Sequence, residues 1–201
     1  MKRTLLVTAV AIAVSLMMPA PAAHADAFTF VADLTQALEV PATGSSGTGF
    51  ATLALDTVAN TMHVDVTFSG LSSGTTASHI HCCLLSPLLT GVNVGVATTT
   101  PTFTDFPLGV TSGSYDHVFD LTLASSYNAA FDGATVASQE ATLVAGIESG
   151  ETYLNIHTTN FPGGEIRGFL VPTPEPSTLL LLGVGLTGLL FLTKKSRAQR
   201  V

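Results

Sequence analysis

Apolar and polar residues alternate along several short stretches of this 201-residue chain. Between residues 62 and 68 every second side chain is apolar, with His63 and Asp65 in the positions between. The same period recurs at 28–34 and 51–55. Because successive side chains of a β-strand point to opposite faces, a period of two indicates strands with one buried face. These stretches are therefore predicted to be half-buried strands.

The rest of the central region adds short strands and a single helix. Further strands are predicted at 77–83, 116–123, 152–158 and 165–171. Clusters of Gly, Ser and Thr at 43–49 and 69–76 supply turns. Apolar residues at helical spacing predict a helix over 136–148, and 91–114 is predicted to be a long loop. Together they predict an all-β, Greek-key-like antiparallel β-sandwich with one short helix, rather than an α/β fold.

Charge is distributed unevenly along the chain. Six of the seven basic residues lie at the two extremities, and only Arg167 lies between them. Residues 26–171 contain 13 acidic residues, which gives this stretch a net charge of −12 with neutral histidines. Such a domain cannot neutralise a phosphate backbone. Nucleic acid is therefore excluded as a partner.

The first 25 residues are predicted to be a secretory signal peptide. Lys2 and Arg3 precede an apolar run over 4–18, and small residues then lead up to Ala25. This order is typical of a signal cleaved by signal peptidase, here after Ala25. The region 26–171 is then expected to be one exported domain.

Residues 172–201 are predicted to hold the domain at a membrane. The apolar stretch 177–193 would form a helix of roughly 25 Å, at about 1.5 Å per residue. Four basic residues follow it, and such clusters stay on the cytoplasmic side. A single transmembrane helix would thus place the domain on the periplasmic side of the inner membrane.

Pro174, Glu175 and Pro176, followed by an apolar helix and a basic tail, resemble the PEP-CTERM sorting signal of Gram-negative bacteria. The resemblance implies processing near this tripeptide by an exosortase-type protease, and then a place at the cell surface or outside the cell. Genomes with this signal usually also encode exopolysaccharide production, so exopolysaccharide or other surface proteins are the expected partners of a surface module. A plain tail anchor is the alternative.

Two histidines on one predicted strand are the sharpest local feature. His79 and His81 share a face, whereas Ile80 points to the core. His157 lies on the outward face of its own predicted strand. If the two strands are neighbours, three imidazoles meet in a set that suits copper or zinc. The alternative is that the histidines bond to backbone or carboxylate groups and hold loops in place.

Cys82 and Cys83 follow directly, and they are the only cysteines of a chain expected in an oxidising compartment. Bridged Cα atoms normally lie about 4.4–6.8 Å apart, so a disulfide between neighbours would be strained. This vicinal bridge is the preferred hypothesis. Ligation of a soft ion such as Cu(I) beside the histidines and cross-linking between chains are the alternatives.

Glu165 and Arg167 alternate onto one face of a predicted strand. The single arginine of the domain is therefore expected to pair with Glu165 or another carboxylate, and to bridge to the histidine strands. This structural pair is preferred over a ligand role for Glu165.

Several ordered segments resemble the CHRD domain, a family first named from chordin, over about residues 28–170. They are Glu39-Val40-Pro41, Gly70-Leu71, His79-Ile80-His81, 153–158 and 161–168. The resemblance implies an extracellular β-rich module with no settled enzymatic activity. The chain departs from the pattern after His81, where many members have Gly-rich residues and this one has Cys82 and Cys83. A role shared across the family therefore need not include the cysteines.

Three functions follow from these features. The first is a non-catalytic binding or structural module of the cell envelope or extracellular matrix. It is favoured because the sequence shows no nucleophile elbow, P-loop, dinucleotide fingerprint or zinc-protease helix motif. The second is an envelope copper- or zinc-binding protein that uses the three histidines, with the cysteines as weaker ligands. The third, a superoxide-dismutase-like redox enzyme, has less support because the sequence shows no clear fourth histidine, bridging ligand or basic steering patch.

Overall fold

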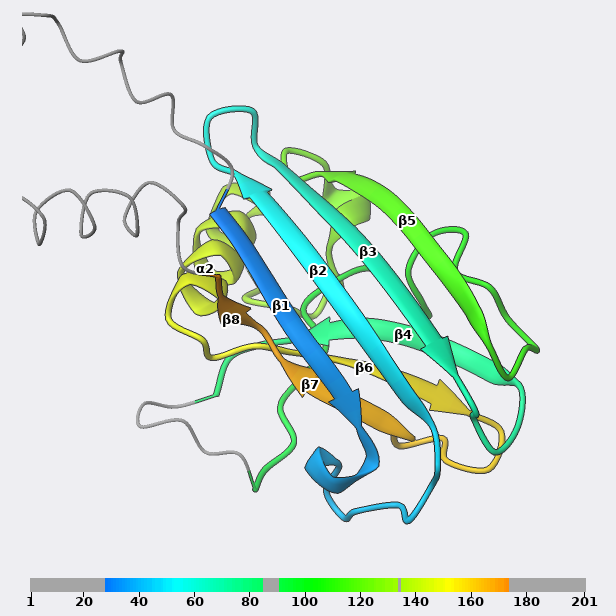
Figure 1. Cartoon of the computed structure of the whole chain (residues 1–201). Coiled ribbons are helices and arrows are strands. Elements are labelled where there is room, and N and C mark those ends of the chain that lie inside the picture. Colours follow the sequence, from blue (N-terminus) through cyan, green and yellow to red (C-terminus); the bar gives the residue numbers. More distant parts are fainter. Residues whose placement is uncertain (1–27, 85–90, 134, 174–201) are drawn as a thin grey trace, which may run out of the picture.

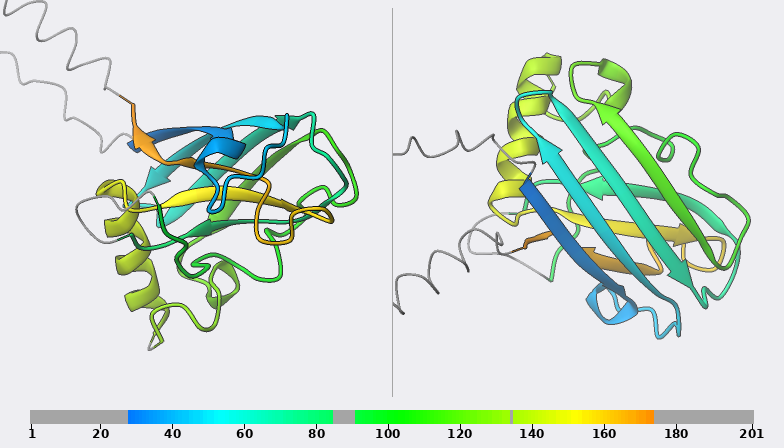
Figure 2. Two further views of the ribbon diagram at one scale, coloured as in Figure 1. Left: turned by 90° about the horizontal axis from the view of Figure 1, so that it is seen from below. Right: turned by 45° about the horizontal axis from the view of Figure 1, so that its top comes forward.

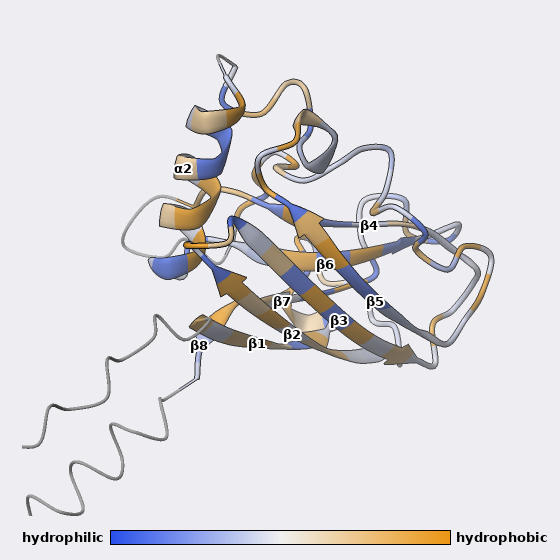
Figure 3. Cartoon of the chain, turned by 90° about the horizontal axis from the view of Figure 1, so that it is seen from above, coloured by the Kyte–Doolittle hydropathy of each residue, from blue (hydrophilic) through white to orange (hydrophobic). Residues whose placement is uncertain are grey.

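The alternating segments form strands in the computed structural model, which describes residues 28–84, 91–133 and 135–173 (Figure 1). The elements, with η for one-turn 3₁₀ helices, are β1 Phe28–Thr35, η1 Gln36–Leu38, β2 Thr48–Asp56, β3 Thr61–Ser69, β4 Thr75–His81, β5 Gly113–Asp120, η2 Ala124–Ser126, α2 Val136–Glu148, β6 Tyr153–Thr158, β7 Ile166–Phe169 and β8 Val171–Pro172. Figure 3 shows the alternation as apolar and polar bands along β1, β2 and β3.

The first layer of the fold consists of β1, β2, β3 and β5, paired antiparallel in that order. The register places Phe30 of β1 opposite Leu53 of β2, and Leu53 opposite Val64 of β3. All three side chains are at most 2% exposed. The two-residue period thus becomes a continuous apolar face directed at the core.

The second layer consists of β4, β6 and β7, and it is joined to the first where β7 pairs with β1. Figure 2 shows this layer lying beneath the first, so that the sheet curls over on itself. Ile80, Leu154 and Ile156 are fully buried and belong to the same core as the first-layer residues. The apolar faces of both layers therefore meet, which leaves the other face of β4 and β6 for polar side chains.

Helix α2 spans the predicted residues and closes one end of the core. Thr135 caps its N-terminus, because its hydroxyl accepts from the backbone N–H of Ser138 while the Ser138 hydroxyl accepts from that of Thr135. Leu143 and Ile147, four residues apart on one face, are fully buried. The helix lies in the connection from β5 to β6, which takes the chain from one layer to the other.

For the part of the chain that the structure describes, the predicted all-β antiparallel architecture with one α-helix is confirmed, with refinements. The two layers are parts of one eight-stranded sheet within the described residues. The segment predicted as one strand over 165–171 is two, β7 and β8, because the Leu170 N–H bonds to the Thr152 carbonyl between them. Strand β5 begins at Gly113, inside the predicted loop 91–114, because Gly113 already pairs with Phe68.

Some of the predicted segments lie outside the described residues. These are the signal peptide 1–25 with its cleavage site at Ala25, the transmembrane helix 177–193, and the tripeptide Pro174-Glu175-Pro176. Among the described residues, no helix is long and apolar enough to cross a membrane.

Candidate metal centre

Strands β4 and β6 place the histidines on the face opposite to the core. The strands pair antiparallel, with His79 opposite Asn155 and His81 opposite Tyr153. His157 lies two residues beyond Asn155 on β6, so it shares that face and is the diagonal neighbour of His79. The two strands are thus neighbours, which is the condition that the three-histidine hypothesis set.

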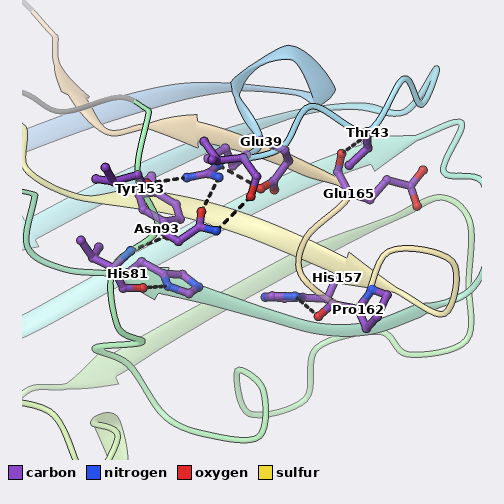
Figure 4. Close-up of polar contacts among 12 residues, drawn as sticks. Glu39, Thr43, His81, Asn93, Tyr153, His157, Pro162 and Glu165 are labelled. Atoms are coloured by element: carbon purple, nitrogen blue, oxygen red, sulfur yellow. Dashed lines mark hydrogen bonds and ion pairs between the residues drawn. The ribbon is translucent and has the colours of Figure 1, made fainter.

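The three imidazoles converge. One nitrogen from each of His79, His81 and His157 lies within 4.8 Å of the others. Nδ1 of His79 and Nε2 of His157 are 3.3 Å apart, and two ligands of a tetrahedral zinc ion, bound at about 2.0–2.1 Å, lie about 3.3 Å apart. Figure 4 shows the rings of His81 and His157 on the same side of the sheet, turned toward each other. This spacing suits a single metal ion.

A backbone carbonyl fixes the other nitrogen of each ring. The contacts are His79 Nε2 to Pro101 at 2.7 Å, His81 Nδ1 to Val94 at 2.7 Å, and His157 Nδ1 to Pro162 at 2.9 Å. A carbonyl oxygen only accepts hydrogen bonds, so each of these ring nitrogens carries a proton and donates it. The same arrangement, with the second ring N–H on a backbone carbonyl, is usual for histidines that bind metals.

The nitrogens that face one another therefore carry lone pairs, because a neutral imidazole has only one N–H. Burial lowers the pKa of His79 and of His81 to about 4 and also lowers that of His157, so no additional proton separates the rings at neutral pH. Nε2 of His81 is buried and has no hydrogen-bond partner among the described residues. Buried lone pairs without a donor are unfavourable, and a cation bound between them would satisfy all three.

A stack of side chains supports the cluster from the second layer. The Tyr153 ring stacks on His81, with centroids 4.7 Å apart and planes 8° apart. On Tyr153 lies the Arg167 guanidinium, 4.5 Å from the ring centre. Arg167 also pairs with Glu39 at 2.9 Å, and both side chains are almost fully buried. Burial raises the pKa of Glu39, and the adjacent guanidinium offsets only part of that effect.

The predicted pair of Glu165 and Arg167 is corrected by these contacts, because the carboxylate partner of Arg167 is Glu39. Glu165 precedes β7, in a turn where Ser45, Ser72 and Thr158 donate hydrogen bonds to its carboxylate. These donors satisfy the charge locally, so Glu165 needs no cation. The predicted bridge from Arg167 toward the histidine strands does exist, through the Tyr153 ring.

The cysteines form the vicinal disulfide that was the preferred hypothesis. The structure does not support the cysteines as weaker metal ligands. Among the described residues, the side chains close enough together to share one ion at this site are the three histidines. The physical reason is that Cys82 shares the core-facing side of Ile80, opposite to His81, and that the disulfide holds the Cys83 sulfur beside that of Cys82. Both sulfur atoms pack on helix α2, where a Cβ on Gly146 would lie 2.5 Å from Sγ of Cys82 and 2.7 Å from Sγ of Cys83. Only glycine allows this approach.

Sequence reasoning missed the residues that orient the histidines. The Pro101 and Val94 carbonyls come from the segment predicted as a featureless loop, and backbone acceptors leave no signature in a sequence. Asn155 was also missed, although its place two residues before His157 on a predicted strand put it on the histidine face. Its side chain is 2% exposed and its Oδ1 has no partner among the described residues.

Fold and site together define a class of protein. It is an antiparallel β-module with a cluster of two buried histidines and one partly buried histidine, on the face of its second layer that points away from the core. The chain belongs to the CHRD domain family, whose model matches residues 30–170. Residues 172–195 match the PEP-CTERM protein-sorting motif, which identifies an exported protein of a Gram-negative bacterium that exosortase recognises and processes at the membrane. Comparison with curated proteins and with solved structures gives no match.

Proposed function

We propose that this exported CHRD-domain protein is a cell-envelope binding module that holds one transition-metal ion, copper or zinc, through His79, His81 and His157. One observation carries the proposal: each ring uses its single N–H on a backbone carbonyl and turns its unprotonated nitrogen toward the other two. Histidines that only held loops in place would need a donor for these nitrogens. The nitrogen set suits copper and zinc.

A metal titration tests the proposal. The purified full-length chain in mild detergent is titrated with Cu(I), Cu(II) and Zn(II) and analysed by native mass spectrometry. We expect one ion per chain, and at least about 100-fold weaker binding in His79→Ala and His157→Ala, because outer-sphere changes alone cost 10–100-fold. The matched control is His63→Ala, which removes an imidazole of the first layer that pairs with Asp116. Absence of a bound ion, or retention of the ion in both cluster variants, would contradict the proposal.

We further propose that residues 177–193 hold the domain at the inner membrane until exosortase acts at Pro174-Glu175-Pro176. The processed domain then reaches the cell surface or the extracellular space, where it contacts exopolysaccharide or other surface proteins. The sorting motif supports this route. Replacing the tripeptide with three alanines should leave the chain unprocessed in the membrane fraction. A substituted chain that is still processed and released would contradict it.

A further inference from the structure

We propose that the histidine site selects a monovalent ion, Cu(I), over Cu(II) and Zn(II). This inference rests on the proposed function, since it concerns the charge of the ion that the same three histidines hold. It starts from the ligand set, in which the described residues supply three neutral imidazoles and no carboxylate. Ligand softness does not decide between these ions, because imidazole binds both copper and zinc.

Among the described residues, the surroundings of the cluster supply no unpaired negative charge either. The side chains on the outer face of the β4–β6 pair are His79, His81, His157, Ala77, Asn155 and Tyr153. The partners of the rings beyond this face are three backbone carbonyls, those of Val94 and Pro101 in the connection from β4 to β5 and that of Pro162 between β6 and β7. The charge that acts on His81 from outside the cluster is the positive charge of Arg167. Glu39, which bears the nearest opposing charge along the stack, is already paired with that arginine.

Charge magnitude then decides which ion is held. His79 is 6% exposed and His81 8% exposed, so an ion bound between them loses much of its hydration. The cost of moving an ion into a medium of low polarity rises with the square of its charge, so a dication pays about fourfold more than a monocation of similar size. Zinc also requires a fourth ligand, whereas Cu(I) accepts three. A zinc ion would therefore have to bring a water molecule or an anion into its fourth position.

The residue Asn155 allows this argument to be tested with almost no change in shape. It lies directly opposite His79, two residues from His157, and it is 2% exposed. Asn155→Asp places a carboxylate at this position. The matched control is Asn60→Asp, which adds the same charge in the turn between β2 and β3, on the first layer.

The experiment measures the Cu(I) and Zn(II) affinities of the full-length chain under anaerobic conditions, by competition with a chromophoric chelator for each ion. We expect the wild-type chain to bind Cu(I) more tightly than Zn(II). Asn155→Asp should shift the ratio of the two affinities toward Zn(II) by tenfold or more, whereas Asn60→Asp should shift it less than twofold. Tighter binding of Zn(II) by the wild type, or equal shifts in the two variants, would overturn the inference.

A second measurement covers the case in which Asn155→Asp does not fold. The Cu(II)/Cu(I) midpoint potential of the wild-type complex should exceed that of copper with free imidazole in the same buffer. A hundredfold preference for Cu(I) corresponds to about 120 mV, at about 59 mV per tenfold for one electron. An equal or lower potential would overturn the inference. If no ion binds at all, the proposed function itself fails, and this result is distinct from binding with the opposite preference.

Discussion

Strand β6 contributes to two groups of polar side chains, because Thr158 bonds to the carboxylate of Glu165 and the neighbouring His157 belongs to the cluster with His79 and His81. The two groups differ in how their hydrogen bonds are completed. Glu165 is fully buried and accepts bonds from Ser45, Ser72 and Thr158. In the histidine cluster Nε2 of His81 is buried and has no partner among the described residues, and the carbonyl contacts of His79 and His157 leave lone pairs on the two nitrogens that face each other at 3.3 Å. A buried group with complete partners is accounted for by the fold alone, whereas one that lacks a partner calls for an explanation, which for the histidines is the proposed ion.

The largest expected effect on stability comes from removing the Glu165 carboxylate, whose hydrogen bonds are complete. Glu165→Ala removes a fully buried carboxylate that accepts four hydrogen bonds, and it leaves the Thr158 hydroxyl buried without its acceptor. We expect a loss of about 4 kcal/mol or more in the free energy of unfolding, since hydrogen bonds to charged groups contribute about 1.5–3 kcal/mol each. Urea unfolding measures it, and the folded fraction should still bind one metal ion. Loss of metal binding from folded Glu165→Ala would erase the distinction between the two groups.

The second effect is the stabilisation that a bound ion gives to the histidine cluster. A metal ion supplied at 100 times its dissociation constant should stabilise the wild-type chain by about 2.7 kcal/mol. For a domain of this size that corresponds to a rise in Tm of roughly 5–10 °C, at about 2–4 °C per kcal/mol. Differential scanning calorimetry with and without the ion measures the shift. His81→Gln should abolish it and His63→Gln should retain it; the reverse pattern would place the ion elsewhere.

A smaller effect dissects the Glu165 site. Thr158→Val keeps the shape of the side chain but removes one donor, whose oxygen lies 2.5 Å from the carboxylate. We expect a loss of about 2 kcal/mol, the contribution of one hydrogen bond to a charged acceptor. Chemical denaturation checks this value. A variant as stable as the wild type would show that the remaining donors satisfy the carboxylate without Thr158.

Per pH unit, the smallest effect is a difference in pH dependence. Burial lowers the pKa of His79 to about 4, so between about pH 6.5 and 4 the unfolded metal-free chain binds a proton that the folded chain does not. Stability is therefore lost as the pH falls through this window, by about 1.4 kcal/mol per pH unit for each such histidine. His79→Gln should lower that slope by about this amount. An unchanged slope would show that His79 is protonated in the folded chain.

The carboxylate follows a separate pH window. Burial alone would raise the pKa of Glu165, but the hydrogen bonds from Ser45, Thr158 and Ser72 outweigh burial and lower it. A carboxyl with a lowered pKa contributes stability above its ordinary value of 4.5, and this contribution is lost only as the pH falls below that value. In an acid titration of the metal-free chain, the loss of stability that comes from His79 should therefore begin near pH 6.5, and the loss that comes from Glu165 should begin only below about pH 4.5.

Much of the fold could be predicted from local patterns. The helix over Val136–Glu148 coincides with its predicted range, because helical spacing and its cap involve residues close in sequence. The strands around Leu53 and Val64 were also found, since a two-residue period is a local property. The split into β7 and β8 was missed because it depends on a bond from Leu170 to Thr152, far away along the chain.

By itself the sequence determined which residues face outward. His79 and His81 share a face, Ile80 and Cys82 share the other, and His157 lies outward on its own strand, because the pleat of a strand fixes the direction of every side chain. Only the tertiary structure decided that β4 and β6 are neighbours, that Arg167 pairs with Glu39, and that three loop carbonyls take the ring protons. These outcomes depend on pairing between distant segments and on backbone groups that every residue carries, so no local pattern encodes them.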